Sequence, residues 1–436
     1  MSLCAAVIKT PGTARAVGGT GPIRNDTNGI PVDFVRCGRV PVRWFAQSCA
    51  VSPRFALSRL PLCGIPGNEY YNTTIVPWMT ITTTPTTTLP PQETTAWSGP
   101  SFRTDRASLV TVRPGRTLFV RKVRLGRADT DQHHHRADGE NADAILQLVL
   151  VHGLCATERQ FAPLLQALHV QLLKEEEEQQ QQQQRPMNDN NNNNTNNKQK
   201  ISTIDCLLYD WMGCGQSRPI LREWDAYDNR EGQEDLAALL RNPDLVSPSR
   251  PLILLGHSYA PSLMFPLLRE RPQPNLVACI LLGTAVQTPS LHQPNGGPWI
   301  MRSLPLVLLR CLQPWLSRAF VARAIHPDSP ALLRHEIIAG SDTNDMALAQ
   351  AYHGHTQWAS PEDAVRAVGH VPCLILHGVD DGIITIAAGQ ELANVLLQSS
   401  TTSRSKLVAV ERTSHLLMLE DPQRVAHEIR SFLSTL

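Results

Sequence analysis

Apolar residues in this chain gather into short runs that have the length and composition of buried β-strands. The first two runs, at 108–112 and 117–120, are joined by an Arg-Pro-Gly-Arg turn and are expected to pair antiparallel. The later runs are apolar at nearly every position, which is typical of parallel strands that helices cover on both faces. The pattern therefore predicts an α/β fold with a mostly parallel, eight-stranded sheet, whose further strands lie at 146–151, 204–209, 251–255, 371–376 and 406–410 and in a run that ends at Leu282.

The run at 251–255 leads into a serine that stands between small residues. Residues 256–260 read Gly-His-Ser-Tyr-Ala, with Gly256 two positions before Ser258 and Ala260 two positions after it. A strand, a sharp turn and a helix in this order lift a serine hydroxyl clear of the backbone, where a base can reach it. The pentapeptide alone also fits an ordinary turn serine, so the assignment of Ser258 as a nucleophile depends on its partners.

Two later strand ends supply the groups that such a serine needs. A serine hydroxyl is a poor nucleophile until a histidine takes its proton and a carboxylate orients that histidine. The run at 371–376 is followed by His-Gly-Val-Asp-Asp, which offers Asp381 and, as an alternative, Asp380. The run at 406–410 leads to His415. Ser258, an aspartate and His415 therefore follow one another in an order that supports a catalytic triad.

An upstream strand end offers the groups of an oxyanion hole. The run at 146–151 is followed by His152, Gly153 and Leu154. A loop of this kind beside the elbow supplies one backbone N–H, and the residue after the nucleophile supplies the other. We assign these donors to the backbones of Leu154 and Tyr259. The plainer interpretation is that His152 and Gly153 only end a strand.

The segment from Asp210 to Ser217 reads Asp-x-x-Gly-x-Gly-x-Ser after a strand. It is similar to a phosphate-binding glycine loop but lacks the third glycine and the helix pattern of that fingerprint. We interpret it as a structural turn.

These motifs together resemble the α/β-hydrolase fold superfamily, in its serine hydrolase type. The resemblance covers roughly residues 140–436, and the usual spacing of the acid favours Asp381 over Asp380. Within the superfamily the chain is most similar to the α/β-hydrolase domain-containing protein 8 subfamily, because of its Gly-His-Ser-Tyr elbow and the segment 305–312. The residues that carry the resemblance are His152, Gly153, Asp210 to Ser217, Gly256, His257, Ser258, Ala260, Gly378, Asp381, Ser414 and His415.

The resemblance implies a serine hydrolase that cleaves carboxylic esters, with lipid-like acyl substrates favoured and no cofactor or metal required. Hydrolases of this fold that cleave carbon–carbon bonds share the Ser, Asp and His set and stay open. So do two functions of other classes. One is a hydrolase-fold binding or scaffold protein whose triad is vestigial. The other is a lysophospholipid acyltransferase, although Glu420 stands where relatives proposed to transfer acyl groups carry an aspartate. Hydrolases of this fold that use an aspartate nucleophile are disfavoured by Ser258.

Composition limits the binding partners and the cellular compartments that are expected for the protein. The formal net charge is +1, which implies no strong attraction to nucleic acid. The ten cysteines form no Cys-x-x-Cys pair, and several fall inside expected strands, so reduced thiols in an intracellular compartment are favoured. Residues 1–68 carry eight basic residues against two acidic ones, which resembles an organellar transit peptide. A cytoplasmic or mitochondrial location is therefore expected.

The chain divides into a disordered leader at 1–100, basic at first and then Thr/Pro-rich, and a hydrolase domain at 101–436. The Glu, Gln and Asn runs at 174–200 predict a disordered insertion. Residues 285–367 predict a helical cap whose helices break at Pro305 and Pro314. Its apolar side chains are expected to pack on the core, to line an acyl-chain pocket or to contact a lipid surface. The histidines at 133–135 are expected in a solvated loop.

Overall fold

The computed structural model describes residues 105–126, 145–183, 201, 203–217, 221, 223–287, 299–399 and 405–436. The predicted leader at 1–100 and the histidines at 133–135 lie outside these residues, and so does the cap segment at 288–298.

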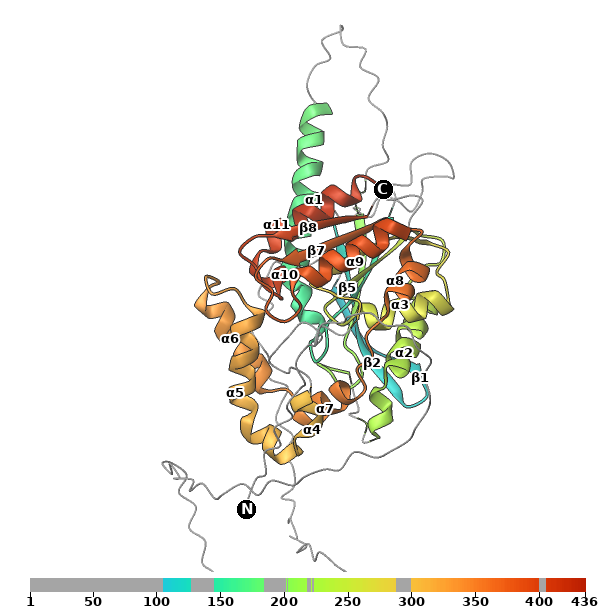
Figure 1. The fold of residues 1–436 in the computed structure, drawn as a ribbon. Helices are drawn as coiled ribbons and strands as arrows, with labels where there is room; N and C mark the ends of the chain where they lie inside the picture. The colour runs from blue at the N-terminus through green and yellow to red at the C-terminus, as the bar shows by residue number, and fades with distance from the viewer. Residues whose placement is uncertain are drawn as a thin grey trace, which may run out of the picture. The chain divides into compact units, whose positions relative to one another are not determined.

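The predicted eight-stranded sheet is confirmed, with the strand order β1-β2-β4-β3-β5-β6-β7-β8 (Figure 1). Strand β1 pairs antiparallel with β2, β2 pairs antiparallel with β4, and all the other pairs are parallel. The strands are β1 (Asp105–Arg113), β2 (Arg116–Leu125), β3 (Ile145–Val151), β4 (Thr203–Tyr209), β5 (Leu252–His257), β6 (Leu276–Leu282), β7 (Cys373–Gly378) and β8 (Lys406–Val410).

The strand order reverses at β3, because the chain passes from β3 outward to β4 and then back across β3 to β5. In open α/β sheets, ligands bind beyond the carboxyl ends of the strands at such a switch point. The loops that follow β3, β5, β7 and β8 all leave this edge of the sheet, since these strands run parallel. The topology thus gathers every predicted site residue at one edge.

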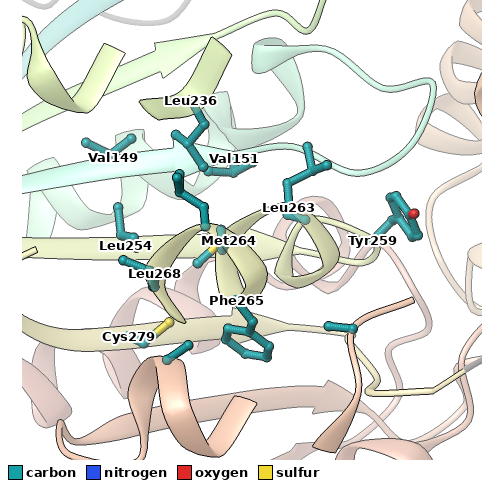
Figure 2. Packing of buried hydrophobic residues seen from close by; sticks show 14 of the residues in the cluster. Val149, Val151, Leu236, Leu254, Tyr259, Leu263, Met264, Phe265, Leu268 and Cys279 are labelled. Atoms are coloured by element: carbon teal, nitrogen blue, oxygen red, sulfur yellow. The ribbon is translucent and has the colours of Figure 1, made fainter. Parts of the chain in front are cut away.

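Helices cover both faces of the sheet, and each face has its own apolar core. On one face α2 (Asn229–Arg241), α3 (Pro261–Glu270), α8 (Pro361–Val368) and α9 (Ile386–Ser399) pack together, and on the other α1 (Ala162–Gln183) packs with α11 (Pro422–Leu433). A short helix, α10 (Leu417–Glu420), precedes α11. Figure 2 shows Leu263, Met264 and Leu268 of α3 lying among side chains of β3, β5 and α2.

Strand β5 leads into Ser258 and is buried at every position. Each fully buried Leu or Ile stabilises the fold by about 1.5–3 kcal/mol relative to an exposed one, so this strand is firmly held. The buried strand therefore fixes the position of the turn that contains Ser258.

Helix α1 corrects the predicted start of the disordered insertion. The insertion was expected from Lys174, but the helix continues through the Glu and Gln residues as far as Gln183. Glu and Gln are good helix formers, and the Arg430 guanidinium pairs with Glu175 at 2.7 Å. Residues 184–200 lie outside the described part of the chain.

The predicted cap contains α4 (Trp299–Ser303), α5 (Leu306–Ala324), α6 (Ala331–Asp342) and α7 (Met346–Gly354). Figure 1 shows these helices grouped apart from the sheet. The predicted boundary at 367 is too late, because α8 packs against α3 and α9 and so belongs to the body of the fold.

The predicted break at Pro314 is wrong, because α5 runs through this residue. Proline removes one helix hydrogen bond, but the buried residues Leu309 and Val321 hold the helix to the protein on either side of it. The helix does begin directly after Pro305, as predicted.

Candidate active site

Ser258 occupies a tight turn between β5 and α3. Its backbone φ is +57°, a left-handed conformation that is rare for residues other than glycine and that is typical of a nucleophile elbow. Its N–H donates to the Leu282 carbonyl of β6 at 2.9 Å, which ties the turn to the neighbouring strand. A Cβ on Gly256 would lie 2.6 Å from the Met264 sulfur and 3.3 Å from the Ala260 Cβ, so the turn requires small residues here.

The structure brings Ser258, His415 and Asp381 into one hydrogen-bonded chain. The distance from Ser258 Oγ to His415 Nε2 is 2.9 Å. The distance from His415 Nδ1 to Asp381 Oδ2 is 2.8 Å. The carboxylate holds a proton on Nδ1, which leaves Nε2 as the acceptor for the serine hydroxyl. His415 and Asp381 are buried, whereas Ser258 is only partly buried and remains within reach of a substrate.

The Asp381 carboxylate is fixed by more than His415. Its Oδ1 accepts the backbone N–H groups of Ile383 and Ile384, each at 2.8 Å. His377 Nε2 lies 3.5 Å from Oδ2 and donates to the Ile384 carbonyl at 2.8 Å. The alternative acid, Asp380, lies away from His415, and its carboxylate is 3.4 Å from His326 Nε2.

Electrostatics keep Asp381 ionised. Burial alone raises the pKa of this carboxyl, but the imidazoles of His415 and His377 and their hydrogen bonds outweigh burial, so its pKa is lower than usual. Burial and the neighbouring His415 lower the pKa of His257 well below its usual value. His257 Nε2 therefore donates as a neutral imidazole to the His415 carbonyl at 3.1 Å and does not compete as a base.

The loop after β3 is held against the elbow by His152. Its Nδ1 donates to the Gly153 carbonyl at 2.7 Å, its Nε2 accepts the Trp211 N–H at 3.0 Å, and its ring stacks on Trp211. Burial lowers the pKa of His152 to about 4, so the ring stays neutral at pH 7. A Cβ on Gly153 would lie 3.0 Å from the Ser258 Cβ, so glycine lets this loop approach the serine closely.

The two N–H groups assigned to the oxyanion hole have no hydrogen-bond acceptor among the described residues. They belong to Leu154, which follows Gly153, and to Tyr259, which follows the serine. The Tyr259 hydroxyl donates toward Asn229 Oδ1 at 2.7 Å and accepts the Gln357 N–H at 2.6 Å, which anchors this residue. A cavity of about 20 Å³ lies beside the Tyr259 ring, is not lined by the triad, and has room for about one water.

The residue pattern of the alpha/beta hydrolase family matches residues 148–428 of this chain. The chain belongs to the α/β hydrolase family. The match spans the elbow and the positions of all three triad residues.

Curated relatives of this hydrolase include protein ABHD8, in agreement with the subfamily resemblance. The mouse protein is 27% identical over 186 residues, which cover 42% of this chain and 39% of the relative. The human protein is 25% identical over 189 residues, with the same coverage of 42% and 39%. The match therefore spans about two fifths of the length of these relatives.

Solved structures share the hydrolase fold. A bromoperoxidase from Bacillus anthracis superposes with a TM-score of 0.52 and 13% identity, covering 75% of this chain and 99% of the other. An esterase from Exiguobacterium antarcticum gives a TM-score of 0.52 and 15% identity, with the same coverage of 75% and 99%.

The predicted structural turn at Asp210–Ser217 holds two loops at the hydrolase site together. The Asp210 carboxylate accepts the N–H of Glu158 and the N–H of Gln216, each at 2.8 Å. It thereby links the loop after β3 to the loop after β4. Gly215 has a φ of +49°, and a Cβ there would overlap the Asp210 carboxylate.

Glu420 has a role that the sequence did not reveal. One oxygen accepts the His326 N–H at 2.6 Å and the Ser329 hydroxyl at 2.7 Å, while the other accepts the Ser414 N–H at 2.7 Å. Glu420 therefore ties the segment after α5 to the loop that carries His415. Only its spacing from His415 was visible in the sequence, and spacing does not show a contact made with the cap.

The described residues contain no group of three or more His, Cys, Asp or Glu side chains placed to hold a metal ion. Within the same part of the chain, every helix is too short or too polar to cross a membrane. Cys206, Cys279 and Cys373 are buried free thiols in strands β4, β6 and β7.

Alanine at Gly378 is expected to destabilise the protein by about 2–4 kcal/mol and to lower turnover. A Cβ there would lie 2.6 Å from the Thr413 carbonyl oxygen and would also overlap the Ser414 backbone, so the loop that positions His415 must move. Urea unfolding measures the first effect, and the rate of the catalysed hydrolysis measures the second. Gly340→Ala is the control, because a Cβ there meets nothing within 4 Å. Equal unfolding midpoints for the two variants would contradict the expectation.

Proposed function

We propose that this α/β hydrolase cleaves carboxylic esters through a covalent acyl-enzyme on Ser258. The observation that carries the proposal is the continuous chain of hydrogen bonds from Ser258 Oγ through His415 to Asp381, with lengths of 2.9 and 2.8 Å. This chain joins a nucleophile, a base and an orienting carboxylate in the arrangement that nucleophilic catalysis needs.

In the first half of the reaction, Ser258 Oγ attacks the ester carbonyl carbon while His415 Nε2 takes the hydroxyl proton. The carbonyl oxygen becomes negatively charged and is stabilised by the N–H groups of Leu154 and Tyr259. The tetrahedral intermediate then collapses, the bond to the alcohol oxygen breaks, and His415 gives its proton to the leaving alcohol. Asp381 stabilises the imidazolium throughout.

In the second half, water attacks the acyl-enzyme and His415 takes one of its protons. The second tetrahedral intermediate expels Ser258 Oγ, which regains a proton from His415, and the carboxylic acid leaves. The cycle consumes one ester and one water and needs no cofactor.

We favour lipid-like acyl substrates because the cap adds apolar residues to the body of the fold. Its helix α7 contributes Leu348, Ala351 and Tyr352 to an apolar core of the body. A long acyl chain gains more from apolar surroundings than a short one.

Two other functions compete with this proposal. Acyl transfer to a lysophospholipid is disfavoured at Glu420, the position where relatives proposed to transfer acyl groups carry an aspartate. The Glu420 carboxylate already accepts three hydrogen bonds within the protein. A purely binding protein is disfavoured because the triad groups lie at hydrogen-bonding distances.

The test is hydrolysis of p-nitrophenyl esters of increasing acyl length by the purified full chain. We expect turnover of at least the activated short esters, with kcat/KM rising as the acyl chain lengthens. Addition of acyl-CoA and a lysophospholipid shows whether transfer competes with hydrolysis. A folded protein that turns over none of these compounds would support the binding role and contradict the proposal.

A further inference from the structure

Exposed apolar side chains are concentrated on the cap. Of the large hydrophobic side chains that are exposed among the described residues, most lie on α5 and α6, whereas the body of the fold exposes few. Those on the cap are Val307 (70% exposed), Leu308 (49%), Leu312 (40%), Trp315 (61%), Phe320 (38%) and Leu332 (69%). A concentration of this kind on a protein surface marks a site of interaction with another apolar surface.

Four of the exposed apolar residues of α5 form one continuous face. Leu308, Leu312 and Trp315 are spaced by four and three residues, so they lie on the same side of the helix, with Val307 beside them. The opposite side carries Leu309, Ser317 and Val321 and is buried against the protein. We call Val307, Leu308, Leu312 and Trp315 the apolar face of α5. The helix packs with α6 and α7, its end joins the core of the body through Val321 and Ala324, and the apolar face stays exposed.

The charged residues of α5 indicate the chemistry of its partner. Helix α5 contains no Asp or Glu, and it carries the arginines Arg310, Arg318 and Arg323. All three arginines are exposed, and within the protein Arg318 donates to the Pro314 carbonyl and Arg323 donates to the Gly382 carbonyl. A helix that exposes Leu and Trp on one side and whose charged residues are all basic fits the boundary between acyl chains and anionic headgroups.

The end of α5 reaches the loops that carry the triad. The Arg323 carbonyl accepts the Gly382 N–H at 3.1 Å and the Ser414 hydroxyl at 2.8 Å. The Ala324 carbonyl accepts the Leu416 N–H at 3.2 Å. A surface bound along α5 is therefore directly connected to the segments that hold Asp381 and His415.

From these observations we propose that the apolar face of α5 docks on an anionic lipid surface. This role rests on the proposed function in one respect: docking would bring a membrane-borne ester to Ser258. The binding itself depends only on α5 and is measured without catalysis.

The test is flotation of the full-length Ser258→Ala protein with vesicles of phosphatidylcholine alone or of phosphatidylcholine mixed with phosphatidylglycerol. This variant leaves the vesicle lipids intact, so the binding result stands whether or not the enzyme hydrolyses esters. We expect binding to the anionic vesicles, weaker binding to neutral ones, and a decrease at high salt.

Added Leu308→Ser and Trp315→Ser substitutions are expected to weaken binding to both kinds of vesicle by at least about tenfold. Added Arg310→Gln and Arg318→Gln substitutions are expected to remove the preference for anionic vesicles. Leu397→Ser is the matched control, because Leu397 is 42% exposed on α9, far along the chain from the cap. Unchanged unfolding midpoints in urea establish that each variant is folded.

Three results would overturn the proposal. In the first, the parent protein binds neither kind of vesicle. In the second, Leu397→Ser weakens binding as much as the α5 substitutions do. In the third, the parent protein is a dimer that the Leu308→Ser and Trp315→Ser substitutions convert to a monomer, which would make the apolar face of α5 a contact between two copies.

Discussion

Alanine at position 258 is expected to lower kcat for ester hydrolysis by about five to six orders of magnitude. The substitution removes the only atom in the triad that forms the covalent bond, while the N–H groups of Leu154 and Tyr259 stay in place. A small residual rate above that of water is expected from these donors and from substrate binding. The effect is confined to chemistry, because the hydrogen bond to His415 is the one that Ser258 Oγ makes among the described residues.

The measurement is turnover of a p-nitrophenyl ester by purified wild type and Ser258→Ala. The matched control is Ser249→Ala, since Ser249 is exposed and its hydroxyl meets only that of Ser247. The control should retain the wild-type rate. If Ser258→Ala kept full activity, the assignment of the nucleophile would be wrong.

Asparagine at position 381 is expected to lower kcat by about four orders of magnitude. The amide no longer holds the proton on His415 Nδ1, so Nε2 loses its role as acceptor for the serine hydroxyl. The loop itself should persist, because the amide oxygen still accepts the N–H groups of Ile383 and Ile384. The loss of activity should therefore appear in kcat, in a variant that is still folded at pH 7.

Asp380→Asn is the control that separates the two adjacent carboxylates. Its side chain is half exposed and faces His326, so the variant should retain turnover within a few fold of the wild type. The opposite pattern, with activity lost in Asp380→Asn and kept in Asp381→Asn, would show that the acid has been misassigned.

The pH dependence of stability gives a second readout for Asp381. The pKa of this carboxyl is lower in the folded protein than in the unfolded chain. Its contribution to stability is therefore fully present above the unfolded pKa, near 4, and is lost as the pH falls below that value. Asp381→Asn should consequently lose less stability than the wild type between neutral pH and acid.

Much of this fold could be predicted from sequence because its strands are buried on both faces. A run such as Leu252–His257 is apolar at nearly every position, and this pattern can be recognised without knowing how the side chains pack. The site residues were visible for a related reason. Ser258, Asp381 and His415 each lie in the segment that follows a strand, and parallel strands bring their carboxyl ends to one edge.

The features that sequence reasoning missed depend on contacts between distant parts of the chain. Nothing local distinguishes the Glu run that extends α1 from a disordered one, since the pairing of Glu175 with Arg430 joins two helices far apart in sequence. Helix α8 was assigned to the cap because its packing against α3 could not be seen. Glu420 likewise contacts the segment after α5 only once the fold has formed.

The most direct test of the account is labelling of the purified full chain with a fluorophosphonate probe, which reacts only with an activated serine. The account predicts a single adduct on Ser258 in the wild type, identified by mass spectrometry, and no adduct in Ser258→Ala. A folded wild-type protein that remains unlabelled, or one labelled at a different serine, would contradict the claim that this chain carries a working Ser-His-Asp triad.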